Sequence, residues 1–253
     1  MVTGRVLLVV ITCAGCVTRE DRKPNTDAAP RDASVAIPHD GGSDAEAVGV
    51  PTILVLGDSH TYGELGQRLH ERLASLGTHA VVSEAAGGAT TETYLEETPE
   101  AFVGYRVRES ARGEGRPRET ARGLRGPLLS LNLLLAKHDP EIVVVALGTN
   151  RPRSGVTESC EAFLARVMRE RQTRRVFWIG PPAVGAERSE ARVAAIKAAI
   201  GKFPNVTFID STPFNASRPL PPNNPHFGPD DARRWADVAF LQMGLVARDA
   251  GDR

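Results

Sequence analysis

Four short segments, far apart in the chain, carry the side chains that an acyl-transfer reaction requires. Gly57-Asp58-Ser59 offers a hydroxyl directly after an apolar run, and His226 offers an imidazole near the C-terminal end. Between them lie Gly88, whose backbone N–H no side chain shields, and Asn150, whose carboxamide can donate a hydrogen bond. Nucleophile, general base and oxyanion donors are the components of nucleophilic catalysis at a carbonyl group.

The pattern of apolar residues predicts the elements that must position these groups. From Pro51 onward, short β-rich runs bounded mostly by Gly, Pro or Asp occur at 53–57, 80–83, 142–147, 176–179 and 206–209. Apolar stripes of helical period occur at 65–76, 124–135, 163–168 and 235–245. The run 142–147 is apolar on both faces, as a central parallel strand covered by helices should be. We therefore expect an α/β fold, a three-layer α/β/α sandwich of flavodoxin-like type with five parallel strands.

In such a fold the loops after parallel strands converge at one edge of the sheet, where ligands bind. Ser59, Gly88 and Asn150 each follow one of the first three strands, and His226 precedes a final helix whose first turn suits Pro229. Taken alone, Gly57-Asp58-Ser59 also fits an ordinary strand-to-helix turn with Ser59 as a cap. The ordered set of four segments favours a functional site.

With these blocks in this order, the chain resembles the SGNH, or GDSL-type, hydrolase superfamily of esterases and lipases, over residues 51–247. The resemblance implies that Ser59 attacks an ester carbonyl and that His226 transfers the proton. It also implies an oxyanion hole made of the Ser59 and Gly88 N–H groups and the Asn150 amide. Gly88 is preferred to Gly87 because the family's glycine has threonine two residues later, as Thr90 is here.

The implied activity is that of a serine esterase or deacetylase that forms an acyl-enzyme, with a small-molecule or glycan ester as substrate. Two alternatives are open: an O-acetyltransferase, and a catalytically weakened binding module with the same fold. The main reason for the second is Asn223, which stands where the family usually has the aspartate of Asp-x-x-His. Asn223 can assist a Ser–His dyad, a carboxylate such as Asp230 or Asp231 can replace it, or the site can be degraded.

Other residue patterns argue against further kinds of site. No His-Glu-x-x-His motif occurs, and the Cys-x-x-Cys pair of Cys13 and Cys16 lies in an apolar leader, so we expect no metal and no cofactor. Lys+Arg and Asp+Glu balance at 31 each, which gives no reason to expect a nucleic-acid partner. His60 is expected to face substrate or to be structural. Three isolated histidines, His70, His79 and His138, are expected at the surface or in packing.

The N-terminal region has the pattern of an exported protein. Residues 1–16 resemble a signal peptide, and Ala14-Gly15-Cys16 resembles the lipobox of bacterial lipoproteins, in which the cysteine is lipidated. An ordinary signal peptide cut near Ala14 and a buried strand are the alternatives. Residues 17–50, poor in large apolar side chains, are expected to be a disordered tether to a hydrolase-like domain at 51–253. We expect a cell-envelope protein, periplasmic or surface-exposed, attached to a membrane through Cys16.

Segment 105–126 is unusually basic, with seven arginines against three glutamates. A solvated, partly helical loop is the simpler interpretation. A sharper hypothesis is that the segment emerges on the catalytic side and attracts an anionic glycan or lipid headgroup.

Overall fold

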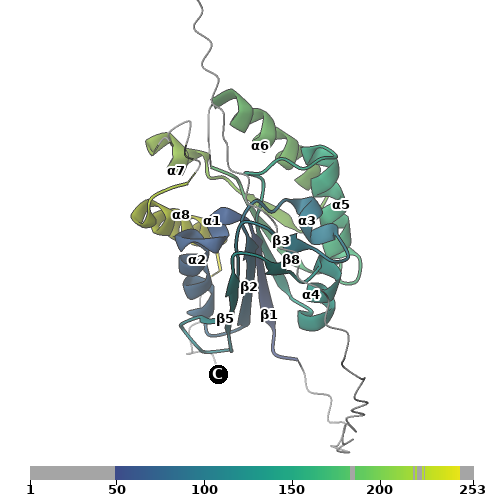
Figure 1. The fold of residues 1–253 in the computed structure, drawn as a ribbon, viewed down its shortest axis with the longest axis vertical. Coiled ribbons are helices and arrows are strands. Elements are labelled where there is room, and N and C mark those ends of the chain that lie inside the picture. Colours follow the sequence, from purple (N-terminus) through teal and green to yellow (C-terminus); the bar gives the residue numbers. More distant parts are fainter. Residues whose placement is uncertain (1–48, 183–185, 219, 221–223, 225, 246–253) are drawn as a thin grey trace, which may run out of the picture. The chain divides into compact units, whose positions relative to one another are not determined.

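A seven-stranded sheet forms the centre of the computed structural model, which describes residues 49–182, 186–218, 220, 224 and 226–245 (Figure 1). Five of the strands are parallel, in the order β2-β1-β7-β8-β9. They are β1 (Thr52–Gly57), β2 (Ala80–Ala86), β7 (Ile142–Ala146), β8 (Arg175–Ile179) and β9 (Val206–Ile209). The five predicted parallel strands are thus confirmed, with bounds that differ by only a few residues.

Helices cover both faces of this sheet, as Figure 1 shows. The first four are α1 (Ser59–Tyr62), α2 (Glu64–Ala74), α3 (Thr91–Leu95) and α4 (Leu131–His138). The others are α5 (Val156–Met168), α6 (Ala186–Ile200), α7 (Thr212–Ser217) and α8 (Pro229–Gln242). The predicted three-layer α/β/α sandwich is therefore confirmed.

The residues of strand β1 show how the sequence specifies a layer of helices on each face of the sheet. Every residue of the strand is buried, and successive side chains point to opposite faces. Ile53 and Val55 pack with α2 and α8, whereas Leu54 and Leu56 pack with α4, α5 and α6. A strand that is buried on both sides needs an unbroken apolar run, and this strand therefore presents its C-terminal end rigidly.

Segment 105–126 is the main correction to the predicted architecture, because it is neither a loop nor helical. It forms β4 (Tyr105–Ser110) and β5 (Arg118–Gly123), an antiparallel hairpin that extends the sheet beside β2. Its charged side chains find partners across the hairpin, such as Arg106 Nε with Glu119 Oε2 at 2.9 Å. The strands that precede and follow the hairpin in the chain, β3 (Glu100–Ala101) and β6 (Gly126–Pro127), pair in a separate two-stranded sheet.

The apolar stripe predicted at 124–135 is helical only in its second half. Leu124 is 76% exposed and lies between β5 and β6, and the helix begins at Leu131. Ser130 starts it, because the Ser130 side chain accepts a hydrogen bond from the Leu133 N–H. The sequence analysis identified neither α6 nor the short helices α3 and α7.

The predicted signal peptide, Cys16 and the tether up to residue 48 lie outside the described residues. Among the helices that are described, none has the length and apolar character required to cross a membrane.

Candidate active site

Ser59 occupies the first position of α1, immediately after β1. Gly57 is required at the end of the strand because a Cβ there would overlap the side chain of Thr61. Asp58 caps the helix, since its Oδ1 accepts a hydrogen bond from the His60 N–H at 3.0 Å. The Gly-Asp-Ser sequence thus produces a tight turn with a half-buried serine at the carboxyl edge of the sheet.

His226 lies against Ser59, although 167 residues separate them in the chain. Its Nε2 is 2.8 Å from Ser59 Oγ. The His226 backbone N–H donates to Asn224 Oδ1 at 3.0 Å, which fixes the loop just before α8. The 2.8 Å between His226 Nε2 and Ser59 Oγ is a hydrogen-bond distance, so the imidazole can accept the serine proton directly.

His60 packs against both His226 and Trp235. Its ring centroid is 4.8 Å from that of His226 and 5.4 Å from that of Trp235, which it meets edge-on. Burial lowers the pKa of His60 to about 3, and the neighbouring His226 acts in the same direction. His60 is therefore neutral at physiological pH, and it packs against His226 as a structural residue.

Gly87 and Gly88, which follow β2, have different backbone environments. The Gly87 N–H donates to the Gly104 carbonyl at 2.7 Å and is thereby occupied. Gly88 is exposed with a φ of +79°, and its N–H has no acceptor among the described residues. Of the two glycines, Gly88 is therefore the one whose N–H is available.

Asn150 lies beside the Gly88 loop. Its Nδ2 donates to the Ala89 carbonyl at 3.1 Å, which uses one of its two amide hydrogens. The preceding turn is held by Arg192, whose Nη1 donates to the Gly148 carbonyl at 3.1 Å and also to the Thr149 carbonyl. Gly148 has a φ of +127°, and a Cβ there would lie 2.8 Å from Ile196.

Two buried carboxyl groups lie close to these loops. Burial raises the pKa of Asp58 to about 7, against the opposing hydrogen bond from the His60 N–H. Burial likewise raises the pKa of Glu84 in β2 to about 7, although its Oε1 accepts from the Leu129 N–H at 3.1 Å. Both carboxyl groups hold their protons more strongly than an exposed carboxyl group does.

Tyr94 links the ends of the two strands that carry the Ser59 and Gly88 loops. Its hydroxyl lies 2.9 Å from the Gly57 carbonyl and 3.0 Å from the Glu84 carbonyl. The residue is fully buried. Sequence reasoning missed Tyr94 and Arg192, since both act on backbone carbonyls and belong to no motif.

The structure thus brings Ser59 and His226 into contact and places Asn150 beside the Gly88 loop. Asn223 lies outside the described residues, so its role stays a prediction. The two carboxylates named as substitutes pair with arginines: Asp231 with Arg218 Nε at 2.5 Å, and Asp230 with Arg233 Nη1 at 3.5 Å. No contact joins either of them to His226 in the described part of the chain.

Two histidines away from this site, His70 and His79, have structural surroundings. His70 is fully buried, and His79 lies 3.6 Å from Glu141. No group of three His, Cys, Asp or Glu side chains within the described ranges is placed to hold a metal ion.

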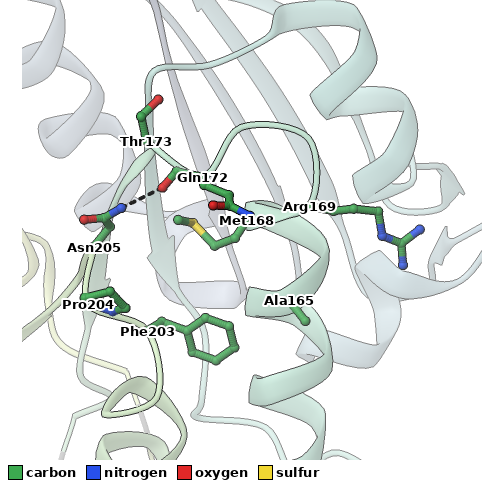
Figure 2. A pocket seen from close by; sticks show the side chains of 8 residues that line it. All are labelled: Ala165, Met168, Arg169, Gln172, Thr173, Phe203, Pro204 and Asn205. Carbon is green, nitrogen blue, oxygen red and sulfur yellow. Dashed lines mark hydrogen bonds between the residues drawn. The ribbon is translucent and has the colours of Figure 1, made fainter.

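A hollow of about 560 Å³ lies at the opposite edge of the sheet, between the end of α5 and the loop before β9 (Figure 2). Figure 2 shows Met168 and Phe203 in its lining, and Asn205 Nδ2 donating to the Gln172 carbonyl at 2.6 Å. None of the predicted site residues lines it.

Comparison with known proteins gives structural similarity without sequence matches. No protein-family model matches the chain, and no curated protein does. A lipase/acylhydrolase from Enterococcus faecalis is similar in structure, with a TM-score of 0.51 and 17% identity, over 76% of this chain and 95% of that one.

Two other similar structures have lower TM-scores. A peptidoglycan O-acetylesterase has a TM-score of 0.49 and 12% identity, over 80% of this chain and 93% of that one. A Clostridium thermocellum family 3 carbohydrate esterase has a TM-score of 0.48 and 13% identity, over 77% and 96%. The similarity to the acylhydrolase confirms the fold that the sequence resemblance implied: the described part of this chain shares the α/β fold of that enzyme.

Proposed function

We propose that this protein is a serine esterase or deacetylase that acts through an acyl-enzyme. The observation that carries the proposal is the 2.8 Å contact between His226 Nε2 and Ser59 Oγ at the carboxyl edge of the sheet. Ester hydrolysis needs a hydroxyl, a base and oxyanion donors within a few ångströms of one another. The fold shared with a lipase/acylhydrolase supports the same reaction class.

In the first half-reaction, Ser59 Oγ attacks the ester carbonyl carbon while His226 Nε2 accepts the hydroxyl proton. The resulting tetrahedral species collapses, the C–O bond to the alcohol breaks, and His226 returns the proton to the leaving alkoxide. In the second half-reaction, water attacks the acyl-serine with the same proton transfers. Acid is released and Ser59 is regenerated.

Three donors are proposed to stabilise the tetrahedral oxyanion: the N–H of Ser59, the N–H of Gly88 and the second amide hydrogen of Asn150. The Ser59 N–H begins α1, where the first N–H groups of a helix have no intrahelical acceptor. The Asn150 bond to the Ala89 carbonyl holds its carboxamide beside Gly88. Backbone donors held in this way need no reorganisation during the reaction, which is why they lower the barrier.

Asn223 is proposed to orient His226, in place of the aspartate that related sequences use. An asparagine carbonyl can accept from the imidazole N–H, but it has no charge with which to stabilise the imidazolium. This proposal predicts an enzyme of modest rate.

The proposed location is the cell envelope, with the protein attached to a membrane through lipid on Cys16 and a tether over residues 17–50. The sequence pattern of residues 1–16 supports this. Radiolabelled palmitate should enter the wild-type protein and not Cys16→Ser. Label that persists in the variant would rule out this cysteine as the anchor. The proposed substrate is a small-molecule or glycan ester, O-acetyl groups of the envelope included.

Hydrolysis of p-nitrophenyl acetate by the wild type and by Ser59→Ala tests the activity. Equal rates in the two proteins would exclude the enzyme and leave the binding module with the same fold. Mass spectrometry after rapid quenching should find acetyl on the peptide that contains Ser59. Added sugar acceptors separate the alternatives further, because an O-acetyltransferase would form acetylated sugar faster than free acetate.

A further inference from the structure

Arg108 of the β4–β5 hairpin reaches the turn that carries Ser59. The residue pairs with Ser83 of β2 in the sheet and is only 2% exposed. Its Nη1 donates to the Thr61 carbonyl at 3.2 Å, and its Nη2 donates to the Tyr62 carbonyl at 2.9 Å. The same Nη2 lies 3.5 Å from the Gly63 carbonyl. One buried guanidinium thus contacts the carbonyls at the C-terminal end of α1.

Helix α1 needs such external support. It has only four residues, and a helix of that length is not stable by itself. Its last carbonyls have no partners within the helix, and they form the negative end of its dipole. A cation with several donors satisfies both requirements, and its planar fork fixes the direction of the carbonyls. Burial lowers the pKa of Arg108 to about 10, which leaves it charged at neutral pH.

The hairpin also contacts the loop on the other side of the site. The carbonyl of Gly104, the residue before β4, accepts the Gly87 N–H at 2.7 Å. Since Gly87 is held in this way, the next N–H, that of Gly88, is the one left available. Arg106 of the same strand lies over the Tyr62 ring, with its guanidinium carbon 4.6 Å from the ring centroid. The hairpin therefore contacts both the turn that carries Ser59 and the loop that carries Gly87 and Gly88.

We propose that Arg108, through which β4 reaches the end of α1, is a positioning residue for Ser59. This inference rests on the proposed function for its catalytic consequence. Arg108 acts on Ser59 through the backbone of α1: it fixes the three carbonyls that end the helix and so fixes the place of the residue that begins it. Substrate contact by Arg108 is not required.

The test compares Arg108→Met, which retains a long stem and loses the charge, with Arg108→Lys and with Arg118→Met. Arg118 is the matched control, because it belongs to the same hairpin, its side chain is 71% exposed and it pairs with Glu114. Each protein is assayed for kcat and KM on p-nitrophenyl acetate, for labelling by a fluorophosphonate probe, and for thermal unfolding. Amide hydrogen exchange is measured at Tyr62 and Gly63, whose N–H groups bond to Asp58, Ser59 and His60 carbonyls.

Arg108→Met should lower kcat about 10- to 100-fold with KM nearly unchanged, because a small misplacement of a reacting group has effects of that size. Exchange at Tyr62 and Gly63 should accelerate while the amides of β1 and β7 stay protected. Arg108→Lys should recover part of both effects, and Arg118→Met should behave as wild type.

The inference is overturned if kcat in Arg108→Met equals that of Arg118→Met. Exchange that rises equally across the domain would also overturn it, because this would show a general loss of stability. If Arg108→Met does not fold, Arg108→Lys decides by the same two measurements. A wild-type protein without hydrolysis or probe labelling would refute the proposed function instead, and the exchange measurements would still test whether Arg108 holds the Ser59 turn.

Discussion

The described part of the chain contains two serine–histidine pairs, which are chemically alike at the level of a single contact. At the candidate site, His226 Nε2 lies 2.8 Å from Ser59 Oγ. In the core, His70 Nδ1 lies 2.6 Å from Ser83 Oγ. By distance alone, the second pair would be an equally good nucleophile and base.

Their surroundings separate them. The second ring nitrogen of His70 bonds to Ser110 Oγ at 3.0 Å, and the ring is fully buried. Burial, together with the charge on Arg108, lowers the pKa of His70 to about 3. Ser83 lies inside β2, where no substrate can approach. His70 of α2 thus links Ser83 of β2 to Ser110 of β4, and its role is structural.

His226, in contrast, is exposed, and Ser59 begins a helix beside the Gly88 and Asn150 loops. A hydrogen bond between serine and histidine therefore does not define a catalytic site. Access, donors for the oxyanion and a place at the carboxyl edge of the sheet distinguish the two pairs.

The largest expected effect comes from removing each serine in turn. Ser59→Ala should abolish ester hydrolysis, with a loss of about four to six orders of magnitude in kcat, since the nucleophile is gone. Ser83→Ala should keep kcat near the wild-type value and lower the free energy of unfolding by about 1–3 kcal/mol, because it leaves a buried ring nitrogen unpaired. Kinetics with urea denaturation of both variants measures this contrast. Hydrolysis lost only in Ser83→Ala would reverse the assignment of the two pairs.

The proposed oxyanion donors provide the next test, because they lie beside only one of the two pairs. Asn150→Ala should lower kcat about 100- to 1000-fold, which is the typical effect of losing one such donor. Asn205→Ala is the control: its amide also donates to a backbone carbonyl, that of Gln172, but at the opposite edge of the sheet. A similar loss of kcat in both variants would show that losing an asparagine hydrogen bond to a backbone carbonyl lowers activity by destabilising the fold, and not by removing an oxyanion donor.

A pH effect on stability should distinguish Asp58, the residue before Ser59, from an ordinary surface carboxylate. In the folded protein burial raises its pKa to about 7, above the ordinary 3.8. Below the unfolded pKa both states are protonated. As pH rises, the unfolded state ionises first, so stability is lost up to the folded pKa.

The free energy of unfolding of wild type, relative to Asp58→Asn, should therefore fall by a few kcal/mol between about pH 4 and about pH 7. Asparagine retains the helix cap and cannot ionise, so the raised pKa of Glu84 and the lowered pKa values of His60 and His70 cancel in the difference. Urea titrations of both proteins across this range measure it. A difference that stays constant with pH would contradict a raised pKa at Asp58.

The smallest expected effect concerns the residue proposed to orient His226. Asn223→Asp should raise kcat several-fold with KM little changed, because a carboxylate stabilises the imidazolium that forms as Ser59 loses its proton. Kinetics on p-nitrophenyl acetate, with Asn224→Asp as the neighbouring control, measures the gain. If the rate does not rise while His226→Ala is inactive, another group orients the histidine.

The sequence predicts the parallel core well, for a physical reason. Buried strands such as β1 require unbroken apolar runs, and glycines mark where they end. Ser59, Gly88 and Asn150 follow such ends, so the convergence of their loops could be inferred from topology alone.

The β4–β5 hairpin could not be inferred in this way. Two strands with arginine at 106, 108, 118 and 122 have the composition of a solvated loop, unless the carbonyls that accept hydrogen bonds from Arg108 are known. Tyr94 and Arg192 likewise act on backbone carbonyls that only the folded chain brings near. Leu124 shows the opposite failure: it fits a helical stripe, yet helix α4 begins only after Ser130.

The charges of β5 have a consequence for behaviour in concentrated solution. As the outermost strand beside β4, it is one of the two sheet edges, opposite β9, at which another chain could add a strand and start aggregation. Its exposed positions carry Arg118, Glu119 and Arg122, and a second copy that approached in register would meet like charges and lose hydration. The residues that made this segment hard to recognise as a strand thus protect the exposed edge of the sheet, and replacing them with apolar residues should make the protein precipitate.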